Sequence, residues 1–201
     1  MLQVKQGAHA GRLLSVGAVT GSDFVDTIAY SDDDAATWTP VEHMFPRTME
    51  AQLTQLPNGS IMFNARHENE TTLGRAVAIS QNADDGGLSW SALHHDPVLV
   101  GPVCEGSIVS FDGAVYFSNP STHGPANLDG RHNITIRRSV DNAASWTSSL
   151  LVDDHRGGDV GAFGYTSLVD APLIRSPAGR GGILWEAWNG SIKFARFDLG
   201  F

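Results

Sequence analysis

Short apolar runs separated by turn residues recur along the whole chain. No stretch keeps its apolar residues at a spacing near 3.6 over three turns, so little helix is expected. The pattern predicts strands over residues 11–17, 27–31, 60–64, 76–80, 106–111, 114–118, 133–139, 165–169, 182–187 and 191–197. Runs of this length between Gly, Pro, Asn and Asp are typical of antiparallel sheets joined by hairpins.

An eight-residue pattern occurs three times between these runs. It covers residues 31–38, 83–90 and 139–146, with Asp at the third place, Gly or Ala at the fifth, Ser or Thr at the seventh and Trp at the eighth. The tryptophans are 52 and 56 residues apart, and a period near 50 residues indicates a propeller or a solenoid. Because Asp folds onto its own backbone and a small residue allows tight curvature, the pattern is interpreted as a structural hairpin turn. Its Trp is expected to be buried between neighbouring units.

The repeat also predicts how the strands are grouped. Each period contains strand, turn, strand, turn, strand, motif and strand, which is a four-stranded antiparallel blade. At roughly 54 residues per blade, the 201 residues hold somewhat under four blades, whereas propellers usually have four to eight. We therefore expect an all-β fold in which residues 1–201 form a single region of a larger ring. Such a region leaves an unpaired sheet edge, which is open to pairing with another chain.

Composition narrows the class of protein further. With 41% hydrophobic residues and a net charge of −9, the chain has the composition of a globular domain with a substantial core, and its acidity argues against a nucleic-acid partner. It has no apolar run of membrane-spanning length, and residues 1–6 lack the apolar stretch of a signal peptide. The lone Cys104 has no internal disulfide partner. The compartment therefore stays undecided.

Four charged or phenolic residues occupy positions where the fold alone does not require such a side chain. Arg66 ends an apolar strand and Arg131 precedes another, while Glu50 comes before Ala51-Gln52-Leu53 and Tyr165 follows Gly161-Ala162-Phe163-Gly164. Taken singly, each is more simply a solvated charge or a rim tyrosine. Their order along the chain is therefore more informative than any one of them.

Metal and cofactor chemistry is not expected. The cluster at residues 94–96 reads His-His-Asp, but adjacent side chains on a strand point to opposite faces. The acidic run at residues 32–34 is interpreted as a solvated turn, with calcium as the less favoured alternative. The glycine pairs lack the Lys-Ser/Thr of a phosphate-binding loop.

Several motifs in order resemble exo-α-sialidases (neuraminidases) of the bacterial and lysosomal type, which carry Asp-box (BNR) repeats. The resemblance rests on the three Asp-boxes together with Asn64-Ala65-Arg66, Phe117-Ser118-Asn119-Pro120, Arg131-His132-Asn133-Ile134-Thr135 and Gly164-Tyr165-Thr166-Ser167-Leu168. It covers nearly the whole chain and matches the C-terminal half or so of that family's catalytic domain. The resemblance implies a partial six-bladed β-propeller of three to four blades.

The resemblance also implies roles for individual residues. Tyr165 matches the nucleophile and Glu50 the carboxylate that activates it. Arg66 and Arg131 match two of the three arginines that bind the sialic acid carboxylate, and Glu186 matches the glutamate that orients the first arginine. The implied reaction is retaining hydrolysis of terminal sialic acid from glycoproteins, glycolipids or oligosaccharides, with no cofactor.

The chain also departs from the family pattern. Nothing in it matches the Phe/Tyr-Arg-Ile-Pro motif of the first arginine, nor the aspartate that protonates the leaving group. The sequence therefore leaves three alternatives: a sialidase catalytic region, a non-catalytic propeller that binds sialic acid or another carboxylate, and a structural propeller that uses Asp-boxes only as turns. The third gives no reason for Glu50, Arg66, Arg131 and Tyr165 to occur together in family order, so it ranks last.

Overall fold

The computed structural model describes residues 1–19, 24–68, 74–80, 83–122, 131–154, 163–169, 180–187 and 190–201. These residues form fifteen strands and one 3-10 turn at Ala83–Asp85. The strands are β1 (Leu2–Gln3), β2 (Leu13–Val19), β3 (Val25–Ser31), β4 (Thr39–Pro46), β5 (Thr48–Gln55), β6 (Ile61–His67), β7 (Gly74–Ile79), β8 (His94–Val100), β9 (Ser107–Phe111), β10 (Ala114–Pro120), β11 (Ile134–Ser139), β12 (Ser148–Asp153), β13 (Thr166–Val169), β14 (Arg180–Glu186) and β15 (Ile192–Asp198).

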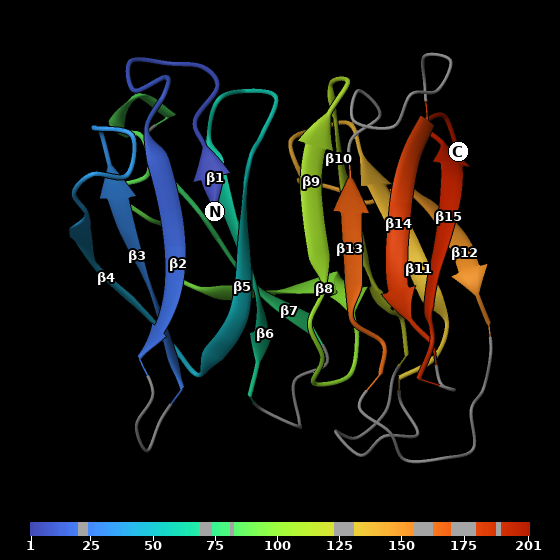
Figure 1. Ribbon diagram of the computed structural model, residues 1–201. Helices are drawn as coiled ribbons and strands as arrows, with labels where there is room; N and C mark the ends of the chain where they lie inside the picture. Colours follow the sequence, from blue (N-terminus) through green and yellow to red (C-terminus); the bar gives the residue numbers. More distant parts are fainter. Residues whose placement is uncertain are drawn as a thin grey trace.

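The strands form four antiparallel sheets that follow one another in chain order. Their strand orders are β1-β2-β3-β4, β5-β6-β7-β8, β9-β10-β11-β12 and β13-β14-β15. Figure 1 shows the sheets as an open row, with the first sheet at the blue end and the last at the red end. The row is confirmed as part of a β-propeller, in which each sheet is one blade.

A separate apolar core lies between each pair of neighbouring sheets. Phe45 of β4 and Phe63 of β6 stack in the first core, with ring centroids 3.9 Å apart. Strand β10 supplies Phe117 to the second core and Tyr116 to the third, because successive residues of a strand point to opposite faces. The sheets therefore depend on one another for burial, and a side chain at one blade edge has a fixed place relative to the next.

The three Asp-box motifs form the turns that their sequence predicts. In the first copy, the Asp33 carboxylate accepts hydrogen bonds from the backbone N and Oγ1 of Thr37, at 2.8 and 2.6 Å. In the third copy, Asp141 accepts the same two bonds from Ser145, at 2.9 and 2.6 Å, and Asp85 of the second copy accepts equivalent bonds. These bonds lower the pKa of Asp33 and Asp141 to about 2. The motif is therefore a locally closed turn held by its aspartate.

The fifth position of each motif explains the preference for a small residue there. Ala35, Gly87 and Ala143 have φ angles of 68°, 90° and 63°. This left-handed region is strained for any residue with a Cβ. The two alanines therefore hold a conformation that glycine adopts freely.

The prediction that the repeated tryptophans are buried between units is only partly correct. Trp90 is 5% exposed and packs in the first core, and Trp146 packs against the second. Trp38 is 39% exposed. Among the described residues, Trp90 and Trp146 each pack toward the sheet that comes before their own in the row. Trp38 belongs to the first sheet of the row.

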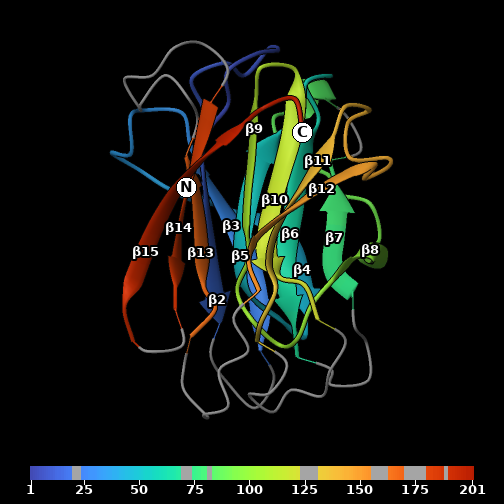
Figure 2. The same cartoon turned by 90° about the vertical axis from the view of Figure 1, so that its right-hand side faces the viewer.

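All ten predicted strands are present, with ends that shift by at most a few residues. Strands β1, β4, β5, β8 and β12 lie outside the predicted runs. The last sheet has three strands, in the order β13-β14-β15, and the exposed side chains of Ile192 and Phe194 lie on β15. Figure 2 shows this sheet from the side. Pairing of its edge with another chain stays a prediction.

Candidate active site

Glu50 lies in an irregular part of β5. Strands β5 and β6 pair Met49 with Arg66 and Gln52 with Asn64, so two residues of β5 face a single residue of β6. This is a β-bulge, a feature that redirects side chains next to functional sites. Glu50 itself has a φ of 53°, a conformation that costs free energy for a residue other than glycine. Apolar and polar residues do not alternate regularly along this strand, so nothing in its sequence marks the position of the bulge.

Tyr165 lies directly before β13, at the end of the loop that enters the fourth sheet. Its backbone N donates to Oε2 of Glu186 at 3.2 Å, and its hydroxyl donates to Oε1 of Glu50. Gly164 before it has a φ of 97°, and a Cβ there would lie 2.9 Å from Cγ of Pro120. The glycine is therefore required for the approach that brings the phenol to Glu50.

The environment makes the Tyr165 phenol less acidic than an ordinary tyrosine. Burial and the Glu50 carboxylate together raise the pKa of Tyr165 to about 12, against a smaller lowering effect of Arg66. A neutral phenol that donates to a carboxylate is arranged to give up its proton during a reaction rather than before it.

Arg66 joins the same cluster from β6. Its Nη1 lies 3.2 Å from Oε2 of Glu50 and 3.5 Å from the hydroxyl oxygen of Tyr165, and its Nε lies 2.8 Å from Oε1 of Glu68. Burial alone would lower the pKa of Arg66, but the carboxylates of Glu50 and Glu68 raise it. The structure thus brings three of the sequence-predicted residues, Glu50, Arg66 and Tyr165, into one hydrogen-bonded group.

Arg131 borders this group and is held by backbone carbonyls. Its Nη1 donates to the carbonyl of Phe163 at 3.1 Å and its Nη2 to that of Val103 at 2.8 Å. Its guanidinium carbon lies 5.8 Å from the ring centroid of Tyr165. Arg131 therefore places its positive charge against the aromatic ring, while Arg66 contacts the hydroxyl.

A hollow of about 320 Å³ lies beside Tyr165. Its walls come from the second and fourth sheets and from the loop before β9: Gln52, Glu105, Tyr165, Thr166, Ser167, Leu184, Trp185, Glu186 and Ile192. Glu186, predicted to orient an arginine, lines this hollow and accepts from the backbone of Tyr165.

Buried charged residues around the group were not predicted from the sequence. Arg75 is 3% exposed and donates to Oδ1 of Asn64 at 2.8 Å and to the carbonyl of Cys104 at 2.6 Å. Burial lowers the pKa of Arg75 to about 10 and raises the pKa of Glu105 to about 7. Burial also raises the pKa of Asp26 to about 6. Their only sequence signal was a charged residue within or next to an apolar strand.

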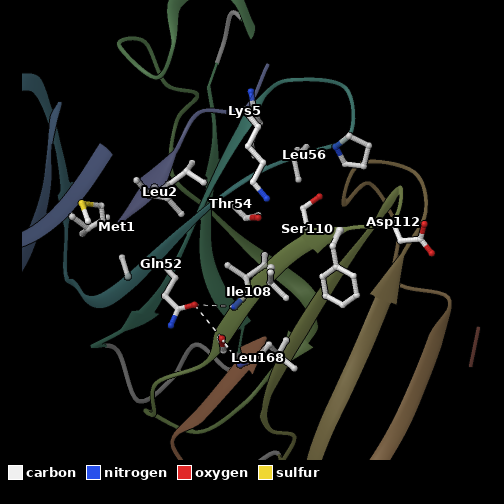
Figure 3. Close-up of a pocket in the computed structure, with 18 of the residues that line it drawn as sticks. Met1, Leu2, Lys5, Gln52, Thr54, Leu56, Ile108, Ser110, Asp112 and Leu168 are labelled. Carbon is white, nitrogen blue, oxygen red and sulfur yellow. Dashed lines mark hydrogen bonds between the residues drawn. The ribbon is translucent and has the colours of Figure 1, made fainter. Parts of the chain in front are cut away.

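A second hollow, of about 880 Å³, is larger but lies apart from this group (Figure 3). Its walls come mainly from β1, β5 and β9 and the residues around them, and Gln52 and Ser167 are shared with the smaller hollow. Tyr165 and Glu186 line the smaller hollow, whereas Glu50, Arg66 and Arg131 line neither of the two. Within the described ranges, no group of three or more His, Cys, Asp or Glu side chains is arranged to hold a metal ion.

Comparison with known proteins agrees with this fold. The BNR repeat-like domain family matches residues 3–173. A sialidase of Bacteroides fragilis is 29% identical over 96% of this chain, and the chain spans 36% of that relative's length.

Among solved structures, a Hadza microbial sialidase is 28% identical, with a TM-score of 0.66. The match covers 94% of this chain and 35% of the sialidase. The leech intramolecular trans-sialidase has a TM-score of 0.75 at 23% identity. The match covers 98% of this chain and 31% of the trans-sialidase.

The chain therefore belongs to the BNR repeat-like family, and its relatives named above are sialidases. It is a propeller region of the sialidase type. Among the described residues, no helix has the length and apolar character needed to cross a membrane.

Proposed function

We propose that this chain carries the nucleophile, its base and two substrate-binding arginines of a retaining exo-α-sialidase. The observation that carries the proposal is the hydrogen bond from the Tyr165 hydroxyl to Glu50, with Arg66 in contact with both. The substrate would be a terminal sialic acid on a glycoprotein, glycolipid or oligosaccharide.

The charge of the substrate explains why a tyrosine suits this role. The carbon that is attacked carries the sialic acid carboxylate, so an anionic nucleophile would approach against repulsion. A phenol is neutral at neutral pH and avoids this, but it is a weak nucleophile until a base removes its proton. The raised pKa of Tyr165, about 12, and its bond to Glu50 support this division of roles.

The proposed reaction has two steps. In the first, the phenol oxygen of Tyr165 bonds to C2 of the sialic acid, the bond from C2 to the leaving group breaks, and Glu50 accepts the phenol proton. In the second, water attacks C2 and gives up a proton to solvent, which neutralises the leaving group released in the first step, while the bond to Tyr165 breaks and the proton on Glu50 returns to the phenolate. Two displacements at one carbon retain its configuration.

The two arginines would bind the substrate carboxylate. A guanidinium keeps its charge and offers a planar pair of donors, which fits a carboxylate well. Arg66 is paired with the carboxylates of Glu50 and Glu68, so the substrate carboxylate would have to compete with them for its donors. Because the chain has a net charge of −9, capture of an anion would depend on this local positive charge rather than on the field of the whole molecule.

A second candidate function is binding of sialic acid without hydrolysis. It is favoured by one observation: no residue in the sequence matches the aspartate that protonates the leaving group. General acid catalysis is worth roughly 10²–10⁴ in rate. Hydrolysis of an ordinary glycoside would therefore be slowed by about this factor if no residue protonates the leaving group. An aryl sialoside is a milder test, since a phenolate leaves more readily without a proton.

The experiment is release of fluorophore from a 4-methylumbelliferyl sialoside by the chain, its Tyr165→Phe variant and the control Tyr30→Phe. The enzyme proposal expects turnover by the chain and the control and none by Tyr165→Phe. Binding of sialic acid by calorimetry without turnover would favour the second function. If the chain shows neither binding nor turnover, both candidate functions are contradicted.

A further inference from the structure

Glu105 contacts both of the segments that carry the Tyr165–Glu50 pair. Its Oε2 accepts from the backbone N of Thr166 at 3.0 Å, and its Oε1 accepts from Nε2 of Gln52 at 3.1 Å. Thr166 directly follows Tyr165, and Gln52 comes two residues after Glu50. A single carboxylate thus holds together two strands from different sheets, β13 and β5.

The other contacts of Gln52 fix which way its amide points. Its Oε1 accepts from Oγ of Ser107 at 3.2 Å and from the backbone N of Ile108 at 3.0 Å, as the dashed lines at Gln52 show in Figure 3. Ser107 in turn accepts from the backbone N of Leu168 at 3.0 Å. Because the amide oxygen is occupied, its NH₂ group must face Glu105, and Glu105 must accept on both of its oxygens.

Charged groups on three strands, β7, β5 and β14, act on Glu105. Arg75 on β7 favours its ionised form, as does the bond from Thr166, whereas the carboxylates of Glu50 and Glu186 oppose it. Burial is the largest effect and raises the pKa of Glu105 to about 7. Its charge therefore changes in the neutral range, and on protonation one of its two acceptor oxygens becomes a hydroxyl donor.

We propose that Glu105 is a positioning residue, whose two-oxygen bridge between Thr166 and Gln52 keeps the hydroxyl of Tyr165 against Glu50. This inference rests on the proposed roles of Tyr165 and Glu50. Glu105 does not need to touch the substrate, since its effect passes through the two strands that it joins. A misplacement of about 1 Å between reacting groups can cost on the order of a hundredfold in rate.

The variant that tests this is Glu105→Gln, which keeps the shape of the side chain but has a single acceptor oxygen. It can satisfy Thr166 or Gln52, but not both. Glu42→Gln, at an exposed carboxylate on β4, is the matched control. A second variant, Gln52→Met, removes one arm of the bridge and leaves the Glu105 carboxylate in place.

The deciding readout is the NMR signal of the Tyr165 ring, which does not depend on turnover. The chain has three tyrosines, so ¹³Cζ labelling of tyrosine gives three signals, and Tyr165→Phe identifies the one that matters. In the wild type this signal should move as pH passes about 7, where Glu105 titrates. In Glu105→Gln it should be displaced at every pH and lack that inflection, and in Gln52→Met it should be displaced but keep it. A Glu105→Gln signal that coincides with the wild type at all pH values would overturn the proposal.

Kinetics with the aryl sialoside separate this inference from the function on which it rests. We expect Glu105→Gln to lower kcat by about tenfold or more while KM stays within about twofold. If the wild type has no turnover, the proposed function fails, and the NMR comparison still decides whether Glu105 positions Tyr165. An unchanged kcat in Glu105→Gln would count against the positioning role even where the wild type is active.

Discussion

The hydroxyl of Tyr165 donates a hydrogen bond to the carboxylate of Glu50, a residue 115 positions earlier in the chain. Glu50 belongs to the second sheet, and Tyr165 enters the fourth. The two meet only because the third sheet packs against both neighbours. The candidate site is therefore a property of the packed row of blades and not of any one blade.

Removing the base without changing its shape tests the role of Glu50. In Glu50→Gln, the amide oxygen can still accept from Tyr165, but it cannot take up the phenol proton. We expect kcat for the aryl sialoside to fall by roughly 10²–10⁴, with the unfolding temperature close to that of the wild type. Steady-state kinetics and thermal unfolding measure the two effects. An active Glu50→Gln variant would exclude Glu50 as the base.

The geometry of the Arg66 guanidinium is tested by Arg66→Lys, which keeps the charge and removes the planar fork. Since hydrogen bonds to charged groups are worth about 1.5–3 kcal/mol, we expect KM for the sialoside to rise by about tenfold to a hundredfold. The matched control is Arg196→Lys on the exposed side of β15. A KM equal to that of the control would show that Arg66 does not bind the substrate.

Asp26 predicts a pH dependence of stability. It is 1% exposed, and burial raises its pKa from 3.8 to about 6. The folded state therefore binds the proton of Asp26 more tightly than the unfolded state. The contribution of protonated Asp26 to the free energy of unfolding is fully present below about pH 4 and is lost as pH rises through about 6. The loss is roughly 3 kcal/mol.

The measurement is the free energy of unfolding by urea at several pH values between 4 and 8, for the wild type, Asp26→Asn and the exposed control Glu42→Gln. The Asp26→Asn variant should gain stability relative to the wild type as pH rises through this range, whereas the control should follow the wild type. A constant difference between Asp26→Asn and the wild type would show that Asp26 is not held neutral by burial.

The strained alanines of the Asp-boxes predict a stabilising substitution. Ala143 has a φ of 63°, and relief of a left-handed residue is worth about 1–2 kcal/mol. The added freedom of glycine in the unfolded chain offsets about 0.4–1 kcal/mol of this. We therefore expect Ala143→Gly to raise the free energy of unfolding by about 0.5–1 kcal/mol.

The neighbouring Ala144→Gly is the control, because its φ is outside the left-handed region and glycine there should destabilise. Urea unfolding of both variants gives the comparison. Equal effects at the two positions would mean that the left-handed φ of Ala143 carries no strain.

The regular parts of the fold were predictable because their signals are local. The Asp-box closes on itself through Asp33 and Thr37, so its sequence suffices to identify it. Strand β5 was missed because it is a polar run, Thr48–Gln55, that is interrupted by a bulge at Glu50. Strand β8 was missed because its stretch begins with polar residues and contains Pro97.

The candidate site was less accessible to sequence reasoning. The roles of Glu50, Arg66, Arg131, Tyr165 and Glu186 came from a family resemblance, since no local pattern marks two residues that are 115 positions apart. Glu105 and Arg75 had only the weak signal of a charged residue within or next to an apolar strand, because their burial arises where sheets meet. The exposure of Trp38 has the same origin, since burial of a repeated residue depends on which sheet lies beside it.

The most direct test of the central claim is covalent trapping at Tyr165. A 2,3-difluorinated sialic acid has a fluoride leaving group that departs without a proton, so it tests the nucleophile independently of an acid. After incubation with the chain, peptide mass spectrometry should find one sialosyl group on the peptide that contains Tyr165, and no adduct in Tyr165→Phe. No adduct on the wild type, or an adduct that persists in Tyr165→Phe, would contradict the assignment of Tyr165 as the nucleophile.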